Sequence, residues 1–344
     1  MMTNKVSGLS GLSLFTDETG ILQHSMFGVI DKRHGYTTDD NSRALLAAVR
    51  FHSRFGGIEP IHLAKRYLEF LLFMNINGGG FHNVISYDRK YLDKNGTEDS
   101  IGQALWATGC TLNSTIPLYL KQLSKWLFDE NLPLTRSFTS PRAKAFTLLG
   151  LCGYSRAYPK DENLLRDIIH FSDFLIQKYL ETEEPEWQWF EQYVTYANAR
   201  IPQALFESYE IVKNPKYLNI AKKSFDFLIE SQFSNGIFIP IGTEGWYYKG
   251  KKKALYDQQP IESACMTEAA FKAAEILADE TYKQRGYESF QWFQGKNTVQ
   301  QSLIDTSNYT CYDGLTPTGV NQNKGAESLI SYLLAELSLP ILTL

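Results

Sequence analysis

Polar segments followed by short, nearly all-apolar stretches recur along the chain, at intervals of about 40 to 65 residues. The first reads TTDDNSRALLAAV and begins at Thr37. The other five are TEDSIGQALWATG from Thr97, TSPRAKAFTLLGL from Thr139, YANARIPQALFES from Tyr196, DQQPIESACMTEAA from Asp257 and NKGAESLISYLLAEL from Asn323. We name these six the helix-start segments, because each predicts a helix that is surrounded by protein on all sides.

Helices of a second kind are predicted between the helix-start segments. They carry charges on one side and large apolar residues at helical spacing on the other, which is typical of helices that face water. They cover residues 61–74, 118–130, 162–180, 216–232 and 281–294. This alternation predicts two concentric layers, and therefore an all-α fold, an (α/α)6 toroid. The sixth outer helix is expected from the N-terminal segment around Leu9–Leu22, or from outside this pattern. We see no linker, so we expect one domain over residues 1–344.

Local signals support the predicted helix starts. Ser140 precedes Pro141, which is a capping residue followed by proline at the first helical position. Acids in the predicted first turns suit the helix dipole. Two long connections, 77–99 and 235–260, each begin with Asn-Gly and then alternate apolar and polar residues, which predicts short hairpins.

The polar ends of the predicted inner helices should gather at one mouth of the toroid, because these helices run parallel. Carboxylates and aromatic rings around a cavity suit glycoside chemistry, in which one acid protonates the leaving oxygen and a second carboxylate activates water or attacks the sugar. The predicted catalytic residues are Asp40, Asp99, Asp257 and Glu262. The predicted substrate-binding residues are Tyr36, Asp39, Arg43, Tyr87, Glu98, Arg142, Trp189, Glu191, Arg200, Trp246, Gln258, Gln259, Tyr312, Asp313 and Glu327.

Each candidate has a structural alternative. A single acid in a first turn is more often a cap, although one cap does not need two acids, so the pair Asp39–Asp40 favours function. Glu262 lies three residues after Gln259 and could close a capping box. The stretch around Trp189 could be a buried aromatic turn, and Tyr312-Asp313-Gly314 could be only a turn. The functional interpretation depends on the set of six segments.

The composition and the spacing of particular residues argue against several other classes of function. The net charge of −4 gives no basic field for nucleic acid, and no stretch predicts a signal peptide or a membrane helix. The four scattered cysteines fit a reducing compartment, so a cytoplasmic location is expected. The six histidines lack metal-ligand spacing, and no nucleotide-binding loop occurs, so neither a metal nor an organic cofactor is expected. His34 and His82 are the only candidates for a histidine-dependent sugar isomerase.

The motifs together resemble a bacterial six-hairpin glycosidase-like family. Its members occur alone, fused to retaining family-4-type glycosyltransferases, or encoded near mannoside phosphorylases. The resemblance covers residues from about 15 to 338 and is carried by YTTDDNSRALLAA, SYDRKYLD with GTEDSIGQALWA, SPRAKAFTLLGL, WQWFEQYVTYANARIPQAL, ALYDQQPIESA, and CYDGL with NKGAESL. Ala197 departs from the pattern, where an aspartate is expected.

The leading hypothesis is a glycoside hydrolase-like protein that acts on an oligosaccharide, with a mannoside as one candidate. The rival from another class is a non-catalytic carbohydrate-binding or regulatory module that works with a glycosyltransferase or a phosphorylase. Such a module would keep the rings and lack an acid/base pair. Sugar isomerisation is the third hypothesis, and it requires a histidine within reach of the ligand.

Overall fold

The computed structural model describes residues 7–340, which contain twelve α-helices and six short antiparallel strand pairs. The chain forms two compact units. The first comprises Met1–Ser172 with Lys324–Ala326, and the second comprises Asp173–Asn323 with Glu327–Leu344. The boundary falls within helix α7 (Glu162–Thr182).

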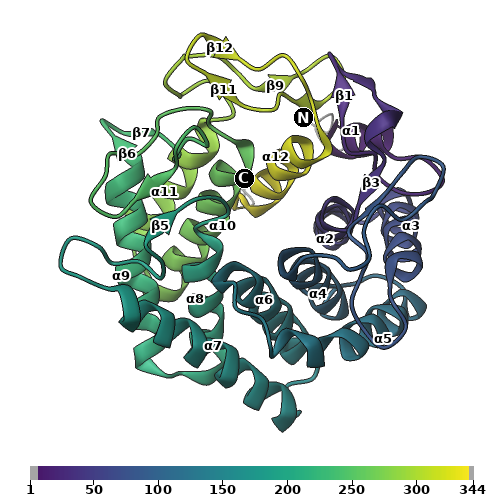
Figure 1. The fold of residues 1–344 in the computed structure, drawn as a ribbon, viewed down its shortest axis with the longest axis horizontal. Helices are drawn as coiled ribbons and strands as arrows, with labels where there is room; N and C mark the ends of the chain where they lie inside the picture. The colour runs from purple at the N-terminus through teal and green to yellow at the C-terminus, as the bar shows by residue number, and fades with distance from the viewer. Residues whose placement is uncertain (1–6, 341–344) are drawn as a thin grey trace. The chain divides into compact units, whose positions relative to one another are not determined.

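The first unit is built on helices that follow one another in the chain and in space (Figure 1). Helix α2 packs against α3 and α4, and α4 packs against α5 and α6. The helices are α1 (Ser7–Phe15), α2 (Thr38–Phe55), α3 (Glu59–Met74), α4 (Glu98–Leu112), α5 (Leu118–Thr135) and α6 (Pro141–Ala157), with a 3-10 turn at Lys32–His34.

The second unit repeats the same pairing of consecutive helices. Helix α8 packs against α9 and α10, and α10 packs against α11. The helices are α8 (Arg200–Val212), α9 (Pro215–Gln232), α10 (Pro260–Leu277), α11 (Glu280–Gln291) and α12 (Ala326–Ser338).

Short antiparallel strand pairs join the connections between helices. Strand β3 pairs with β4 and β5 pairs with β8, so each pairing brings a long connection beside the residues that precede an inner helix. The pairs are β1 (Ser25–Met26) with β2 (Val29–Ile30), β3 (Tyr36–Thr37) with β4 (Val84–Ile85), β5 (Tyr193–Val194) with β8 (Tyr247–Tyr248), β6 (Phe233–Ser234) with β7 (Ile237–Phe238), β9 (Ile304–Asp305) with β10 (Thr310–Cys311), and β11 (Leu315–Thr316) with β12 (Gly319–Val320).

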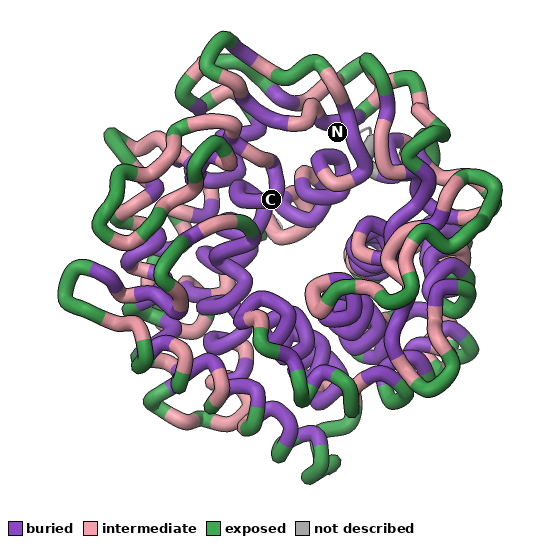
Figure 2. The backbone as a smooth tube through the Cα atoms, in the orientation of Figure 1, coloured by how far each residue is buried: buried purple, intermediate pink, exposed green. Residues whose placement is uncertain are grey.

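Burial separates the two predicted kinds of helix. Helix α6 is buried at every position from Pro141 to Ser155. Helix α3 alternates buried and exposed positions, as an amphipathic helix does. The same contrast is visible along the backbone in Figure 2, where α2, α4 and α6 are largely buried.

Glycines allow α4 and α6 to approach closely. A Cβ added at Gly109 would lie 2.2 Å from the carbonyl oxygen of Gly150, and one added at Gly150 would lie 2.4 Å from that of Leu105. Real Cβ atoms do not come so near to backbone, so neither position tolerates a side chain without a shift of a helix. Gly109 and Gly150, which lie near the ends of two helix-start segments, therefore serve the packing of α4 against α6.

The six inner helices and the five outer helices predicted from the sequence all occur. Helix α1 lies in the segment expected to supply the sixth outer helix. The Ser140 hydroxyl caps α6 by accepting a hydrogen bond from the backbone N–H of Ala143, with Pro141 at the first helical position. None of the helices within residues 7–340 is both long enough and apolar enough to cross a membrane.

Candidate functional site

The start of α2 holds two adjacent acids that differ in exposure and in hydrogen bonding. Asp40 is buried, and its carboxylate accepts hydrogen bonds from Arg43 Nη2 at 2.9 Å and from Thr37 Oγ1 at 2.8 Å. The Asp39 side chain is 30% exposed and lies 3.8 Å from the same guanidinium. Asp40 is therefore an anion held in place by two donors, whereas Asp39 is the acid that a ligand can reach.

The connection from α3 to α4 runs beside the start of α2. Thr38 donates from its backbone N–H to Asn83 O at 2.8 Å and from its hydroxyl to His82 O at 2.6 Å. Asp93 Oδ2 accepts from the backbone N–H of Asn83 at 2.7 Å. Two buried acceptors here, Asn83 Oδ1 and Asp93 Oδ1, have no hydrogen-bond partner among the described residues, and Asp93 Oδ1 lies 3.6 Å from His82 Nδ1. Buried acceptors of this kind are normally satisfied by water or a ligand hydroxyl.

His82 is oriented by this connection. Its ring stacks on Tyr91 with centroids 3.9 Å apart, and its Nδ1 lies 3.0 Å from the carbonyl oxygen of Asp93. A carbonyl only accepts, so Nδ1 is the donor of this hydrogen bond, and Asp93 Oδ1 lies 3.6 Å from the same nitrogen. Nε2 is therefore the ring nitrogen that is left to meet a ligand.

The starts of α4 and α6 are joined by two acids. Glu98 accepts hydrogen bonds from the backbone N–H groups of Thr139 at 2.9 Å and Ser140 at 2.8 Å, so its carboxylate satisfies donors that precede α6. Asp99, which is partly exposed, accepts from Ser140 Oγ at 3.2 Å. Glu98 therefore organises the backbone before α6, and both carboxylates are partly exposed. Arg142, next in this segment, is buried.

The two tyrosines predicted to bind substrate in the first unit differ in exposure. Tyr36 has no exposed surface and donates its hydroxyl to Asp17 Oδ2 at 2.6 Å. Burial raises the pKa of the Tyr36 hydroxyl, and this hydrogen bond adds to the effect. Tyr87 is 43% exposed and accepts from Lys32 Nζ at 2.8 Å. We correct the prediction for Tyr36, because a ring without exposed surface packs in the interior and cannot contact a ligand in this structure.

Glu262 occupies the first turn of α10 and is 1% exposed. Its carboxylate accepts hydrogen bonds from the backbone N–H of Ala197 and, at 2.8 Å, from Asn198 Nδ2. It makes no capping box with Gln259, which has no side-chain capping bond. Glu262 ties the residues before α8 to the start of α10 by accepting from both of these donors.

Arg200 is also engaged within the second unit. Its guanidinium donates to Glu268 Oε1 at 2.5 Å and to Gln203 Oε1 at 2.7 Å, and all three side chains are buried. Burial alone would lower the pKa of Arg200, but the neighbouring Cys265 and Glu268 outweigh burial and raise it. The predicted role of Arg200 in binding sugar hydroxyls is corrected to the pairing of helices α8 and α10.

The segment before α10 holds a carboxylate without a fixed partner. Asp257 is partly exposed, and within residues 7–340 its side chain forms no hydrogen bond or ion pair. The neighbouring Gln258 is fully buried, accepts from Trp292 Nε1 at 2.9 Å and donates to Thr298 Oγ1 at 3.1 Å. Gln258 therefore fixes the backbone and is corrected from a ligand to a positioning residue, while Gln259 is partly exposed.

Aromatic side chains beside the starts of α8 and α10 include one residue that sequence reasoning missed. Trp189 has no exposed surface and packs on Phe190 and Phe227, so its predicted contact with sugar is corrected to core packing. Trp246 is partly exposed and faces Tyr196, with ring centroids 6.5 Å apart. Tyr196 is 39% exposed and opens a helix-start segment, which is the signal that could have identified it.

The last helix-start segment is held by Asp313. Its carboxylate accepts from Ser328 Oγ at 2.6 Å and from Asn323 Nδ2 at 2.9 Å. Tyr312, Glu327 and Glu191 are partly exposed. Among the described residues no group of three or more His, Cys, Asp or Glu side chains could hold a metal ion.

No family model matches the chain, and no curated protein matches it. Solved structures match it over nearly its whole length. A D-mannose isomerase has a TM-score of 0.75 at 13% identity, over 97% of this chain and 95% of the other. Cellobiose 2-epimerase from Bacillus thermoamylovorans has a TM-score of 0.75 at 12% identity, over 97% of both chains.

Glycoside hydrolases share the fold as well. The GH76 alpha-mannanase of Bacteroides thetaiotaomicron has a TM-score of 0.69 at 11% identity, over 97% of this chain and 94% of the other. An alpha-1,6-mannanase of Salegentibacter, solved with alpha-1,6-mannotriose as an inactive variant with two consecutive aspartates replaced by asparagine, has a TM-score of 0.66 at 11% identity, over 97% and 98%. These neighbours are six-hairpin glycosidase-like enzymes, and they confirm the predicted (α/α)6 toroid fold class.

Proposed function

We propose that this protein is a carbohydrate-active enzyme that hydrolyses a glycosidic bond. The observation that carries the proposal is the division of the helix-start acids into two kinds. In the first unit Asp40 is buried and held by internal donors while Asp99 is partly exposed, and in the second unit Glu262 is buried and held by internal donors while Asp257 is partly exposed. Hydrolysis needs accessible carboxylates in a fixed frame, and this arrangement supports both requirements.

The two accessible carboxylates lie in different units. Asp99 lies in the first turn of α4 and accepts a hydrogen bond from Ser140 Oγ, which orients its carboxylate. The Asp257 side chain forms no hydrogen bond or ion pair within residues 7–340, so its carboxylate can turn toward a ligand. We propose each of them as a candidate acid or base. Asp39 is also partly exposed, and we assign it to binding sugar hydroxyls.

The aromatic pair supports a sugar ligand. Tyr196 and Trp246 expose ring surface beside the residues that Glu262 holds, and a sugar's C–H face packs well on such rings. The substrate we propose is a mannoside. Three of the structural neighbours act on mannose or mannan by their titles, and this chain carries the consecutive aspartates Asp39–Asp40.

Sugar isomerisation or epimerisation is a second candidate, and the geometry of His82 favours it. The ring is partly exposed, its Nδ1–H faces the carbonyl oxygen of Asp93, and Nε2 is the nitrogen that could take up a proton from a sugar. An isomerase needs such a base to remove the proton beside a carbonyl group.

A product assay separates these candidates. The protein is incubated with a panel of manno-, gluco- and cello-oligosaccharides and with free mannose and glucose, and the products are resolved by anion-exchange chromatography. Shorter oligosaccharides indicate hydrolysis, whereas conversion of free sugar into a ketose or an epimer indicates the second candidate. Binding without any product would overturn both and leave the non-catalytic module.

A further inference from the structure

The described part of the chain buries four glutamine side chains, Gln103, Gln203, Gln232 and Gln258. Gln203 and Gln258 are hydrogen-bonded to other side chains. For Gln103 and Gln232, neither amide atom forms a hydrogen bond within residues 7–340. A buried amide without partners costs free energy, and such a group is normally satisfied by water or by a ligand.

Gln103 differs from Gln232 in its position. It lies on α4 one turn after Asp99, the candidate acid or base of the first unit, whereas Gln232 is the last residue of α9. Side chains of a helix lean toward its N-terminus, so the Gln103 amide extends toward the turn that carries Asp99. The two residues are about 6 Å apart along the helix axis, which is close to the size of one sugar ring.

Accessibility along this face of α4 decreases from its start. Asp99, Gln103 and Trp106 share the face, since they are four and then three residues apart. Asp99 is partly exposed, Gln103 is 7% exposed and Trp106 is 2% exposed. The Trp106 ring stacks on Phe146 with centroids 5.8 Å apart, and the Arg50 guanidinium of α2 lies over it at 5.6 Å. The face therefore closes after Gln103.

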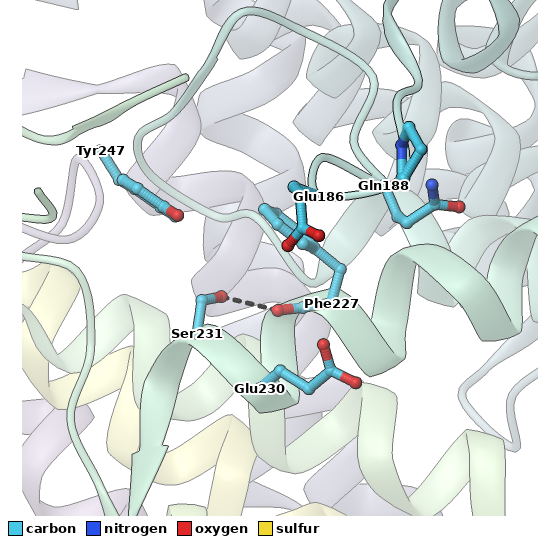
Figure 3. Close-up of a pocket in the computed structure, with 7 residues that line it drawn as sticks. Glu186, Gln188, Phe227, Glu230, Ser231 and Tyr247 are labelled. Carbon is cyan, nitrogen blue, oxygen red and sulfur yellow. Dashed lines mark hydrogen bonds between the residues drawn. The ribbon is translucent and has the colours of Figure 1, made fainter. Parts of the chain in front are cut away.

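Gln188, labelled in Figure 3, is the contrasting case. It lines a pocket of about 220 Å³ in the second unit, and both atoms of its amide are used within the protein. Its Nε2 donates to Glu184 O at 2.6 Å, and its Oε1 accepts from the Tyr179 hydroxyl. An amide engaged in this way is held by its own protein, whereas the Gln103 amide has both its donor and its acceptor to offer.

We propose that the Gln103 amide is a specificity-determining contact for the sugar that binds beside Asp99, and that it holds two neighbouring hydroxyl groups of a mannoside. An amide carries an acceptor and a donor side by side, which matches two neighbouring hydroxyl groups. A site built to hydrogen-bond a hydroxyl rejects an analogue that lacks it, because its buried polar group is then left unpaired. The class of ligand rests on the proposed function, and Gln103 is new to the site, since the sequence did not single it out.

The test is a titration of the full chain with methyl α-mannoside and with the analogues that each lack one of its hydroxyl groups, followed by ligand-observed NMR. The methyl glycoside has no free anomeric hydroxyl, so an isomerase could not convert it. The variant is Gln103→Met, which removes the amide at similar side-chain length. Gln232→Met is the matched control, because it removes an equally unpartnered amide outside the candidate site. Neither variant should lower the urea midpoint, because the amide it removes leaves no partner behind.

The parent should bind methyl α-mannoside saturably, and two analogues that lack neighbouring hydroxyl groups should bind roughly three- to tenfold more weakly. Gln103→Met should bind methyl α-mannoside more weakly by at least the same factor and should bind those two analogues no worse than the full sugar, because they lose one shared contact. Gln232→Met should bind as the parent does. No saturation of the parent, or parental binding by folded Gln103→Met, would overturn the proposal and show that the amide holds only water.

The outcome is separable from the test of hydrolysis. Binding that depends on Gln103, without cleavage of any oligosaccharide, would overturn the proposed hydrolase and support the contact. Cleavage of a mannoside by Gln103→Met with the parental KM, together with parental binding of the methyl glycoside, would overturn the contact alone.

Discussion

Replacing Glu262 by Gln tests whether this acid is a structural anion, as its surroundings indicate. The carboxylate is 1% exposed and accepts from the backbone N–H of Ala197 and from Asn198 Nδ2. A glutamine retains one acceptor, but its NH2 group then faces a donor that loses its partner.

The expected loss follows from these contacts. A charged hydrogen bond contributes about 1.5–3 kcal/mol, and a buried donor without a partner costs about 1–3 kcal/mol. The neutral amide avoids the desolvation of a buried charge, which offsets part of this cost. We therefore expect Glu262→Gln to lower the free energy of unfolding by about 1–3 kcal/mol.

The assay is urea unfolding followed by circular dichroism, with the denaturant dependence checked for constancy. Asp257→Asn is the matched control, because the Asp257 side chain has no internal partner and its amide should change stability by less than about 0.5 kcal/mol. Combining Glu262→Gln with Asn198→Ala should give a smaller loss than the sum of the two single losses, because they break one shared contact. An unchanged unfolding midpoint for Glu262→Gln would refute the assignment.

Three further outcomes are expected. Gly109→Ala should destabilise the protein by about 1–3 kcal/mol, because the new methyl meets the backbone of α6. Gly286→Ala, whose methyl would lie nearest to the side-chain ring of Phe271, should cost less in the same thermal melts. Burial lowers the pKa of Lys253 to about 8, so the unfolded chain holds this proton to higher pH than the native state. Stability should therefore rise from about pH 8 to about pH 10 in the parent relative to Lys253→Met, and parallel profiles in urea would contradict this. Trp246→Leu should raise KM for an oligosaccharide roughly fivefold or more with little change in kcat, measured by initial rates.

The helix positions could be predicted from the sequence because a buried helix face requires apolar residues at helical spacing. The helix-start segments contain the capping residues and first-turn acids that mark a helix start. Helices α2, α4 and α6 begin within two residues of the starts that these signals predict. The close contact of Gly109 with Gly150 left no such signal, because each glycine acquires meaning only from a helix about 40 residues away.

The sequence could not predict which acids are held by internal hydrogen bonds, because their donors are distant in the chain. Glu262 and its donor Asn198 are 64 residues apart, and Glu98 and Thr139 are 41 apart. The sequence places these acids at helix starts but contains no sign that distant donors hold them. Likewise Trp189 and Trp246 have similar aromatic surroundings in the sequence, and only packing makes one a core residue and leaves the other partly exposed.

The most direct test of the central claim is the rate of oligosaccharide hydrolysis by the parent, Asp99→Asn and Asp257→Asn, on the first substrate that the product assay identifies. Loss of an acid or base typically costs a factor of about 100 to 10,000, so both variants should fall at least about 100-fold in kcat while remaining folded in the absence of urea. Parental rates in both folded variants would contradict the account.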